Sequence, residues 1–106
     1  LERLARRALF GLARTGSSMS NGSGDYVIAF SSAASVRRST SESSQQVTQL
    51  SNETLTPLFQ AVAEATEEAI YNSMLKAVTT TYGETTVEAL PIDRVVEVLR
   101  KYGAVR

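Results

Sequence analysis

The chain has 106 residues, 42% of them apolar, and its 11 basic residues balance its 11 acidic residues. This length suits one small domain, and the zero net charge excludes a global field that would attract nucleic acid or an anionic membrane. The sequence contains no His and no Cys, which excludes a Ser-His-Asp triad, a Cys-His pair, the usual zinc ligands and a disulfide framework.

The first 16 residues predict one amphipathic helix that ends near Gly16. Its apolar residues recur at helical spacing, while Arg3, Arg6 and Arg7 fall mainly on the other side. We interpret these arginines as a solvated face and not as a nucleic-acid patch, because no aromatic side chains interleave them as stacking platforms. The apolar positions are Leu1, Leu4, Ala5, Ala8, Leu9 and Leu12.

A turn-forming cluster, Ser17 to Gly24, leads into a short strand predicted from Tyr26 to Phe30. This run is apolar on both alternating faces, which is typical of a strand buried on both sides. The only other strand candidate is a weaker one at Thr85 to Ala89. We therefore expect another chain or flanking sequence to supply the rest of the sheet.

The second half of the chain predicts a polar loop followed by two helices. Residues 32–52 are rich in Ser, Thr and Gln and indicate a long loop. A helix then begins at Asn52 or Thr54 and continues to about Thr79, with its glutamates on the side opposite the apolar stripe. A break at Tyr82 and Gly83 precedes a last helix from Pro91 to near Gly103. The order of elements indicates a layered α/β domain. The glutamates are Glu64, Glu67 and Glu68.

The segment Asn21-Gly22-Ser23-Gly24-Asp25 concentrates groups that could carry chemistry. The two glycines give the backbone access to positive φ, and Ser23 and Asp25 can share one face because they stand two residues apart in an extended segment. From the residues alone, the plainer interpretation is a turn whose side chains satisfy nearby backbone amides. Anion binding by the glycines has little support, because a strand and not a helix follows. A Ser-Lys dyad is not expected either, since Lys76 and Lys101 lie in predicted helices.

Two stretches of the sequence resemble a known family. The run LARRALFGLARTGS (residues 4–17) with NGSGDYVIAFS (residues 21–31) is similar to the downstream, post-cleavage part of the DmpA-like aminopeptidases. That family is also called the P1 or S58 peptidases, and it includes the β-peptidyl aminopeptidases. Residues 57–62, 65–72 and 87–91 look like the C-terminal helices of the family.

This resemblance implies an α/β/β/α sandwich of the N-terminal-nucleophile-hydrolase type. Residues 1–106 would form the C-terminal part of a single self-processed hydrolase domain. In this family the precursor cuts itself before a serine, and that serine becomes the nucleophile of the downstream chain. We expect the nucleophile, Ser or Thr, roughly 20 residues upstream of Leu1, from one strand and one loop of usual length. The free α-amine of that residue would serve as the base, with no metal and no organic cofactor.

The resemblance also assigns roles within the segment of residues 21–25. Ser23 would relay the proton of the nucleophile, and Asp25 would orient that network or hold a substrate ammonium group. Asn21, Gly22 and Gly24 would contribute to substrate binding. The family also shows a glutamate at the position of Asp25, so the carboxylate here has a shorter reach.

The expected partners follow from the same resemblance. They are the upstream chain of the same precursor, short peptide, amide or ester substrates, and further copies of the protein in a homo-oligomer. No nucleic-acid or membrane partner is expected. The alternatives are an acyltransferase of similar fold and a non-catalytic assembly or binding relative. The start of the chain has no signal-peptide pattern, which favours a cytoplasmic location and leaves a periplasmic one open.

Overall fold

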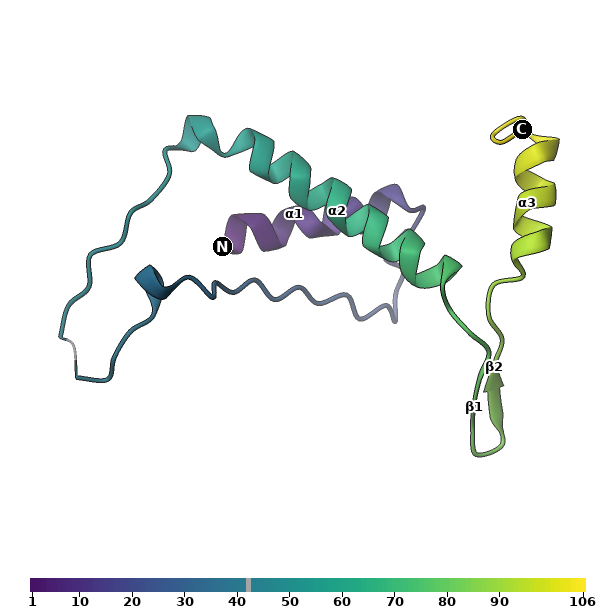
Figure 1. Ribbon diagram of the computed structural model, residues 1–106, viewed down its shortest axis with the longest axis horizontal. Coiled ribbons are helices and arrows are strands. Elements are labelled where there is room, and N and C mark those ends of the chain that lie inside the picture. Colours follow the sequence, from purple (N-terminus) through teal and green to yellow (C-terminus); the bar gives the residue numbers. More distant parts are fainter. Residues whose placement is uncertain (42) are drawn as a thin grey trace. The chain divides into compact units, whose positions relative to one another are not determined.

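Three α-helices and one two-stranded antiparallel sheet are the regular elements of residues 1–41 and 43–106, which the computed structural model describes (Figure 1). They belong to two units, a first unit of residues Leu1–Glu67 and a second unit of residues Glu68–Arg106. This mixture of helix and antiparallel strand agrees with the predicted α/β class. The elements are α1 (Glu2–Arg14), α2 (Thr56–Leu75), β1 (Thr80–Tyr82), β2 (Thr85–Val87) and α3 (Ile92–Lys101).

Helix α1 ends where the sequence predicts. Glu2 lies in its first turn and Arg14 in its last, and both charges complement the helix dipole. The hydroxyl of Thr15 donates a hydrogen bond to the carbonyl of Leu12 (2.7 Å), and Gly16 then adopts a φ of +92°. Glycine tolerates this left-handed conformation at little cost, so the chain leaves the helix there.

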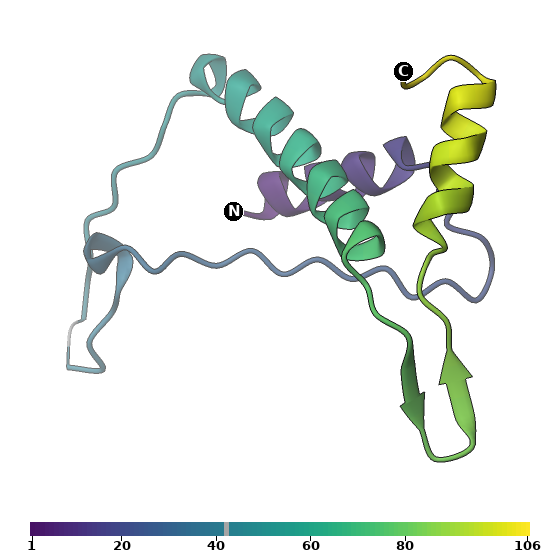
Figure 2. The same cartoon turned by 45° about the vertical axis from the view of Figure 1, so that its right-hand side comes forward.

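Helices α1 and α2 cross at closely packed small residues (Figures 1 and 2). Ala8 and Gly11 of α1 are buried, as is Ala63 of α2. A Cβ atom added to Gly11 would collide with the carbonyl oxygen of Ala63 and lie 2.7 Å from Cβ of Thr66. The two helices can approach this closely only because position 11 has no side chain.

Two arginines of α1 place their guanidinium groups over an aromatic ring of the first unit. The guanidinium carbons of Arg3 and Arg7 stand 4.9 Å and 4.6 Å from the ring centroid of Phe59. Arg3 also donates a hydrogen bond to Oδ1 of Asn52 (2.6 Å). Arg3 and Arg6 are exposed and match the predicted solvated face, and Arg6 forms an exposed ion pair with Glu2 there. The prediction is wrong for the half-buried Arg7, because an arginine can place its charge over an aromatic ring while its stem covers apolar surface.

The predicted strand from Tyr26 to Phe30 is extended, but it forms no sheet within the described residues. A strand needs the backbone hydrogen bonds of a neighbouring strand, and none lies beside this segment in the described chain. Tyr26, Ile28 and Phe30 are 90%, 87% and 81% exposed. Val27, on the opposite side of the segment, lines a hollow together with residues of α1. One face of the segment therefore borders a hollow beside α1, and the other is bare.

The polar segment of residues 32–52 forms the predicted loop in its described part; Glu42 lies outside the described residues. A short 3-10 turn spans Ala34–Val36, and the side-chain amide of Gln45 donates to the carbonyl of Ser35 (3.0 Å). A second 3-10 turn, Asn52–Thr54, leads into α2. Helix α2 ends at Leu75, before the predicted end near Thr79, because the chain enters a hairpin.

In the second unit, β1 and β2 form a hairpin with the pairs Thr80 to Val87, Thr81 to Thr86 and Tyr82 to Thr85. The hydroxyl groups of Thr81 and Thr86 hydrogen-bond across it (2.9 Å). Gly83 opens the two-residue turn with a φ of +57°, which suits a type II′ turn. The weaker strand candidate is thus confirmed in β2, and β1 was not predicted.

Substitution of Gly11 by alanine separates helix propensity from packing. Propensity alone predicts that Gly11→Ala stabilises α1 by up to about 1 kcal/mol. The collision with the Ala63 carbonyl, which belongs to a rigid helix backbone, should cost about 1 to 3 kcal/mol and dominate. We expect a lower melting temperature for Gly11→Ala in the complete protein. A raised melting temperature would show that α1 and α2 do not cross in this way.

Candidate functional site

The candidate site begins with a tight turn between α1 and the extended segment. The amide of Ser23 donates to the carbonyl of Ser20 (2.9 Å), and Gly22 adopts a φ of +96°. Gly24 keeps an ordinary negative-φ backbone, and a Cβ atom there would lie 3.4 Å from the ring of Tyr26. Of the two glycines, only Gly22 uses the positive φ that the sequence predicts. Asn21, the remaining predicted substrate-binding residue, is exposed on this turn.

Ser23 and Asp25 meet as predicted. The hydroxyl of Ser23 donates a hydrogen bond to Oδ2 of Asp25 (2.5 Å), and both residues are exposed. A hydroxyl that donates to a carboxylate still has oxygen lone pairs that can accept a proton from another group. The Ser23 oxygen can therefore accept a hydrogen bond from another group while Asp25 orients its hydroxyl.

Asp25 also lines an open hollow of about 230 Å³ beside α1. Ala5, Leu9 and Val27 supply its apolar wall, and the exposed Glu2 and Arg6 ion pair supplies its charged edge. Asp25 and Val27 face this hollow together because they stand two residues apart in extended backbone. The hollow places a carboxylate beside apolar surface, in solvent-accessible space next to Ser23.

An ion pair fixes the end of α1 on α2. Nε of Arg14 lies 2.9 Å from Oε2 of Glu67. The sequence predicts Glu67 on the side of α2 opposite the apolar stripe, but its side chain is largely shielded and forms an ion pair with α1. A helical pattern gives the face of a residue relative to its own helix, and it does not identify the partner helix. Gly11 inside a helical run was the available signal for a close helix contact.

A Ser-x-x-Lys spacing, which a Ser-Lys dyad could use, occurs at Ser73 and Lys76. Ser73 lies near the end of α2, where its hydroxyl donates to the carbonyl of Ile70 (2.7 Å). Lys76 follows the last helical residue, Leu75, and both Ser73 and Lys76 are exposed. The serine proton is committed to the backbone, so the spacing does not form an activated nucleophile here.

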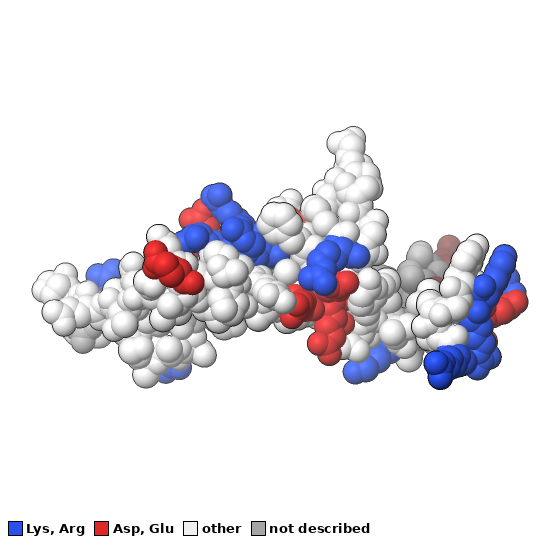
Figure 3. Space-filling model, turned by 90° about the horizontal axis from the view of Figure 1, so that it is seen from above, with Lys and Arg blue, Asp and Glu red and all other residues white. Residues whose placement is uncertain are grey.

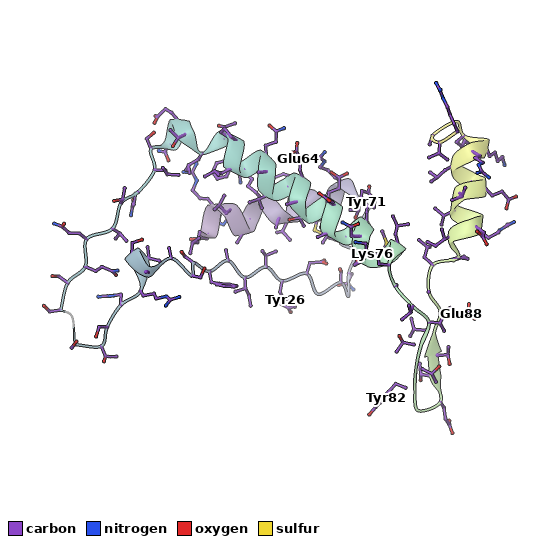
Figure 4. All side chains as sticks on the ribbon, viewed as in Figure 1. Tyr26, Glu64, Tyr71, Lys76, Tyr82 and Glu88 are labelled. Carbon is purple, nitrogen blue, oxygen red and sulfur yellow. The ribbon has the colours of Figure 1, made fainter. Side chains whose placement is uncertain are left out.

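The second unit has a wider hollow of about 540 Å³ at the base of the hairpin. Its walls are mostly aliphatic, and Glu88, which follows β2, is the only ionisable residue among them (Figure 4). None of the predicted site residues lies there. Tyr82 is at the far end of the same hairpin, with its side chain extending into open space (Figure 4). The lining consists of Met74, Ala77, Val78, Thr80, Val87, Glu88, Ala89, Leu90 and Pro91.

Charged residues of both signs are interspersed on the face shown in Figure 3, in keeping with the zero net charge.

In residues 1–41 and 43–106, no three His, Cys, Asp or Glu side chains gather as metal ligands would. None of the helices in this described part has the length and apolar character needed to cross a bilayer.

Comparison with known proteins assigns the chain to a family. The sequence profile of peptidase family S58 matches residues 1–87. The chain belongs to this family. The resemblance of this S58 chain to the DmpA-like peptidases, inferred from its motifs, is thereby confirmed.

Curated relatives and a solved structure extend this match. The S58 chain is 41% identical over 103 residues to beta-peptidyl aminopeptidase BapA of Sphingosinicella microcystinivorans, which covers 96% of the chain and 26% of that relative. It is 31% identical over 102 residues to BapA of Sphingosinicella xenopeptidilytica, covering 94% of the chain and 25% of that relative. The crystal structure of the PH0078 protein from Pyrococcus horikoshii OT3 superimposes with a TM-score of 0.81 at 41% identity, over 95% of this chain and 29% of that one. The S58 chain thus spans about a quarter of the length of these BapA relatives.

Proposed function

We propose that this S58 chain carries the proton-relay part of a self-processing aminopeptidase that releases N-terminal residues from short peptides, amides or esters. The observation that carries the proposal is the Ser23 to Asp25 hydrogen bond within the family motif. The name beta-peptidyl aminopeptidase, borne by relatives that match nearly the whole chain, supports the substrate class.

The proposed reaction is acyl transfer to an N-terminal nucleophile on the upstream segment of the same precursor. The hydroxyl of that Ser or Thr attacks the substrate carbonyl carbon and forms an acyl-enzyme as the amine leaves. Its proton passes through Ser23 to the free α-amine, whose usual pKa of about 7.7 to 8.0 suits a base near neutral pH. The leaving amine takes up that proton, and water then releases the acyl group and restores the hydroxyl.

Asp25 has two proposed tasks in this reaction. As the acceptor for the Ser23 hydroxyl, its carboxylate orients the relay and stabilises positive charge that develops on the α-amine. As a lining residue of the hollow beside α1, it can also attract the ammonium group of a substrate. Asn21, Gly22 and Gly24 form the adjoining turn, and we assign them to the substrate-binding surface.

We further propose that the extended segment from Tyr26 to Phe30 becomes an inner strand of an α/β/β/α sandwich. The hollow that it shares with α1 on one face and its bare apolar face on the other support this assignment. Such a strand in a sandwich packs on helices on one side and on a second sheet on the other. The neighbouring strands would come from the upstream part of the precursor.

The strand assignment predicts a pattern of hydrogen exchange. In the complete protein, the amides from Val27 to Phe30 should exchange slowly, because a paired inner strand opens only in large unfolding events. The amides of residues 37–41, in the polar loop, should exchange quickly. Equal and fast exchange in both segments, measured by mass spectrometry, would contradict the sandwich.

Self-processing predicts a specific new terminus. The full gene product should separate into two fragments, and Edman sequencing of the fragment that contains Leu1 should begin with Ser or Thr. A fully active protein that remains a single uncut chain would contradict this mechanism.

The relay predicts separate effects of two variants on turnover and stability. Ser23→Ala should lower kcat by about 10² to 10⁴, the usual range for general acid-base assistance, and leave the melting temperature nearly unchanged. Asp25→Asn keeps the shape and removes the charge, so it should also lower activity without unfolding the protein.

The matched control for these variants is Ser18→Ala, which removes an exposed hydroxyl from the same loop and should retain activity. If the serine only stabilised a turn, Ser23→Ala would reduce stability by about 0.5 to 1.5 kcal/mol and spare kcat. Near-normal turnover in both Ser23→Ala and Asp25→Asn would remove the pair from the mechanism.

A further inference from the structure

We infer that Arg14 is a positioning residue for the candidate site: its ion pair with Glu67 fixes the point where the loop of residues 15–25 leaves α1. The consequence for turnover rests on the proposed function, because it assumes that Ser23 and Asp25 act in the reaction. The anchoring of the loop can be measured by hydrogen exchange, which needs no activity assay.

The Arg14 and Glu67 pair differs from the other ion pairs of the described residues. The pairs Glu2 with Arg6 and Arg94 with Glu97 lie within single helices, and all four of their side chains are well exposed. Arg14 and Glu67 join two helices, with the side chain of Glu67 21% exposed and that of Arg14 51% exposed. Exposed pairs contribute little, whereas a pair with one shielded partner is screened less by solvent, and this pair also holds one helix against another.

The backbone on which Glu67 stands is itself held against α1. A Cβ atom on Gly11 would lie 3.1 Å from the amide nitrogen of Glu67, so α1 touches the backbone of α2 at this residue. Arg14 lies about one helical turn after Gly11 on the same side of α1. The last turn of α1 is therefore held at two successive points, by packing at Gly11 and by charge at Arg14.

The loop that follows has few constraints of its own. Between Arg14 and Asp25, the hydroxyl of Thr15 bonds back to α1, the amide of Met19 bonds weakly to the Ser17 hydroxyl (3.3 Å), and the Ser23 amide closes a turn on Ser20. The point where this loop leaves α1 limits the region that Ser23 and Asp25 can reach, so a shift of that point changes how often the two residues lie in the reacting geometry. Misplacement of a reacting group by about 1 Å can cost about 10²-fold in rate.

The test measures local opening and turnover in the complete protein. Arg14→Gln removes the charge and keeps a polar side chain of similar reach. Within the peptide that covers residues 15–25, we expect faster deuterium uptake at the hydrogen-bonded amides of Thr15, Gly16 and Ser23, with little change elsewhere. We also expect kcat to fall by about 10- to 100-fold while KM changes much less, because the relay is displaced and substrate binding is largely retained.

A double-mutant cycle tests whether Arg14 acts on the loop through its ion pair with Glu67. If Arg14 acts through Glu67, then Arg14→Gln, Glu67→Gln and the double variant should accelerate exchange in the loop to a similar extent. Two controls match these changes. Arg94→Gln breaks the exposed pair on α3, and Glu68→Gln removes the neighbouring, exposed carboxylate of α2. Both controls should leave exchange in residues 15–25 and kcat unchanged.

The possible outcomes test two points separately: whether the ion pair of Arg14 with Glu67 anchors the loop of residues 15–25 (the anchor), and whether the proposed function is right. Additive effects of Arg14→Gln and Glu67→Gln, or a fall in melting temperature without faster exchange in the loop, would overturn the anchor. If the complete protein has no peptidase activity, the proposed function fails, while non-additive and loop-specific exchange still supports the anchor. If activity is present and kcat is unchanged in Arg14→Gln despite faster exchange, Arg14 is not a positioning residue for the reaction.

Discussion

The close crossing of α1 and α2 at Gly11 and Ala63 is the constraint on which the first unit depends. Because no Cβ atom separates the helices there, residues on either side of the crossing come within reach of each other. Arg3 and Arg7 reach Phe59 before the crossing, and Arg14 reaches Glu67 after it. Larger residues at the crossing would move the helices apart, and these contacts would lengthen together.

The chemistry of the site follows from what the chain lacks. Because these 106 residues contain no histidine and no cysteine, they can contribute only hydroxyl, carboxylate and amine groups to a proton transfer. The proposed relay uses a serine that donates to an aspartate, and the turn at Gly22 places this pair at the beginning of the extended segment. In the proposed enzyme, the helices provide a rigid support and the loop provides the reacting groups, a division of roles common to many enzymes.

The features that the sequence predicted are those set by local rules. The ends of α1 and α3 follow from capping, glycine and dipole preferences, and the meeting of Ser23 with Asp25 follows from the two-residue repeat of extended backbone. Contacts between distant segments were missed, because a helical pattern shows which face is apolar and does not name the partner. For this reason the sequence predicts Arg7 on a solvated face and Glu67 on the polar side of its helix, without their partners. β1 was missed because three residues, Thr-Thr-Tyr, carry too little periodicity.

The bare face of Tyr26, Ile28 and Phe30 has a consequence for biosynthesis. An aromatic and β-branched segment with open backbone groups is the kind of sequence that self-associates into cross-β aggregates. The strands proposed to pair with it are distant in sequence. Contacts between distant segments form slowly during folding, so the segment stays unpaired for longer. During that interval the nascent protein would depend on chaperones that hold such segments apart. Folding yield, more than final stability, would then limit how much active protein a cell obtains.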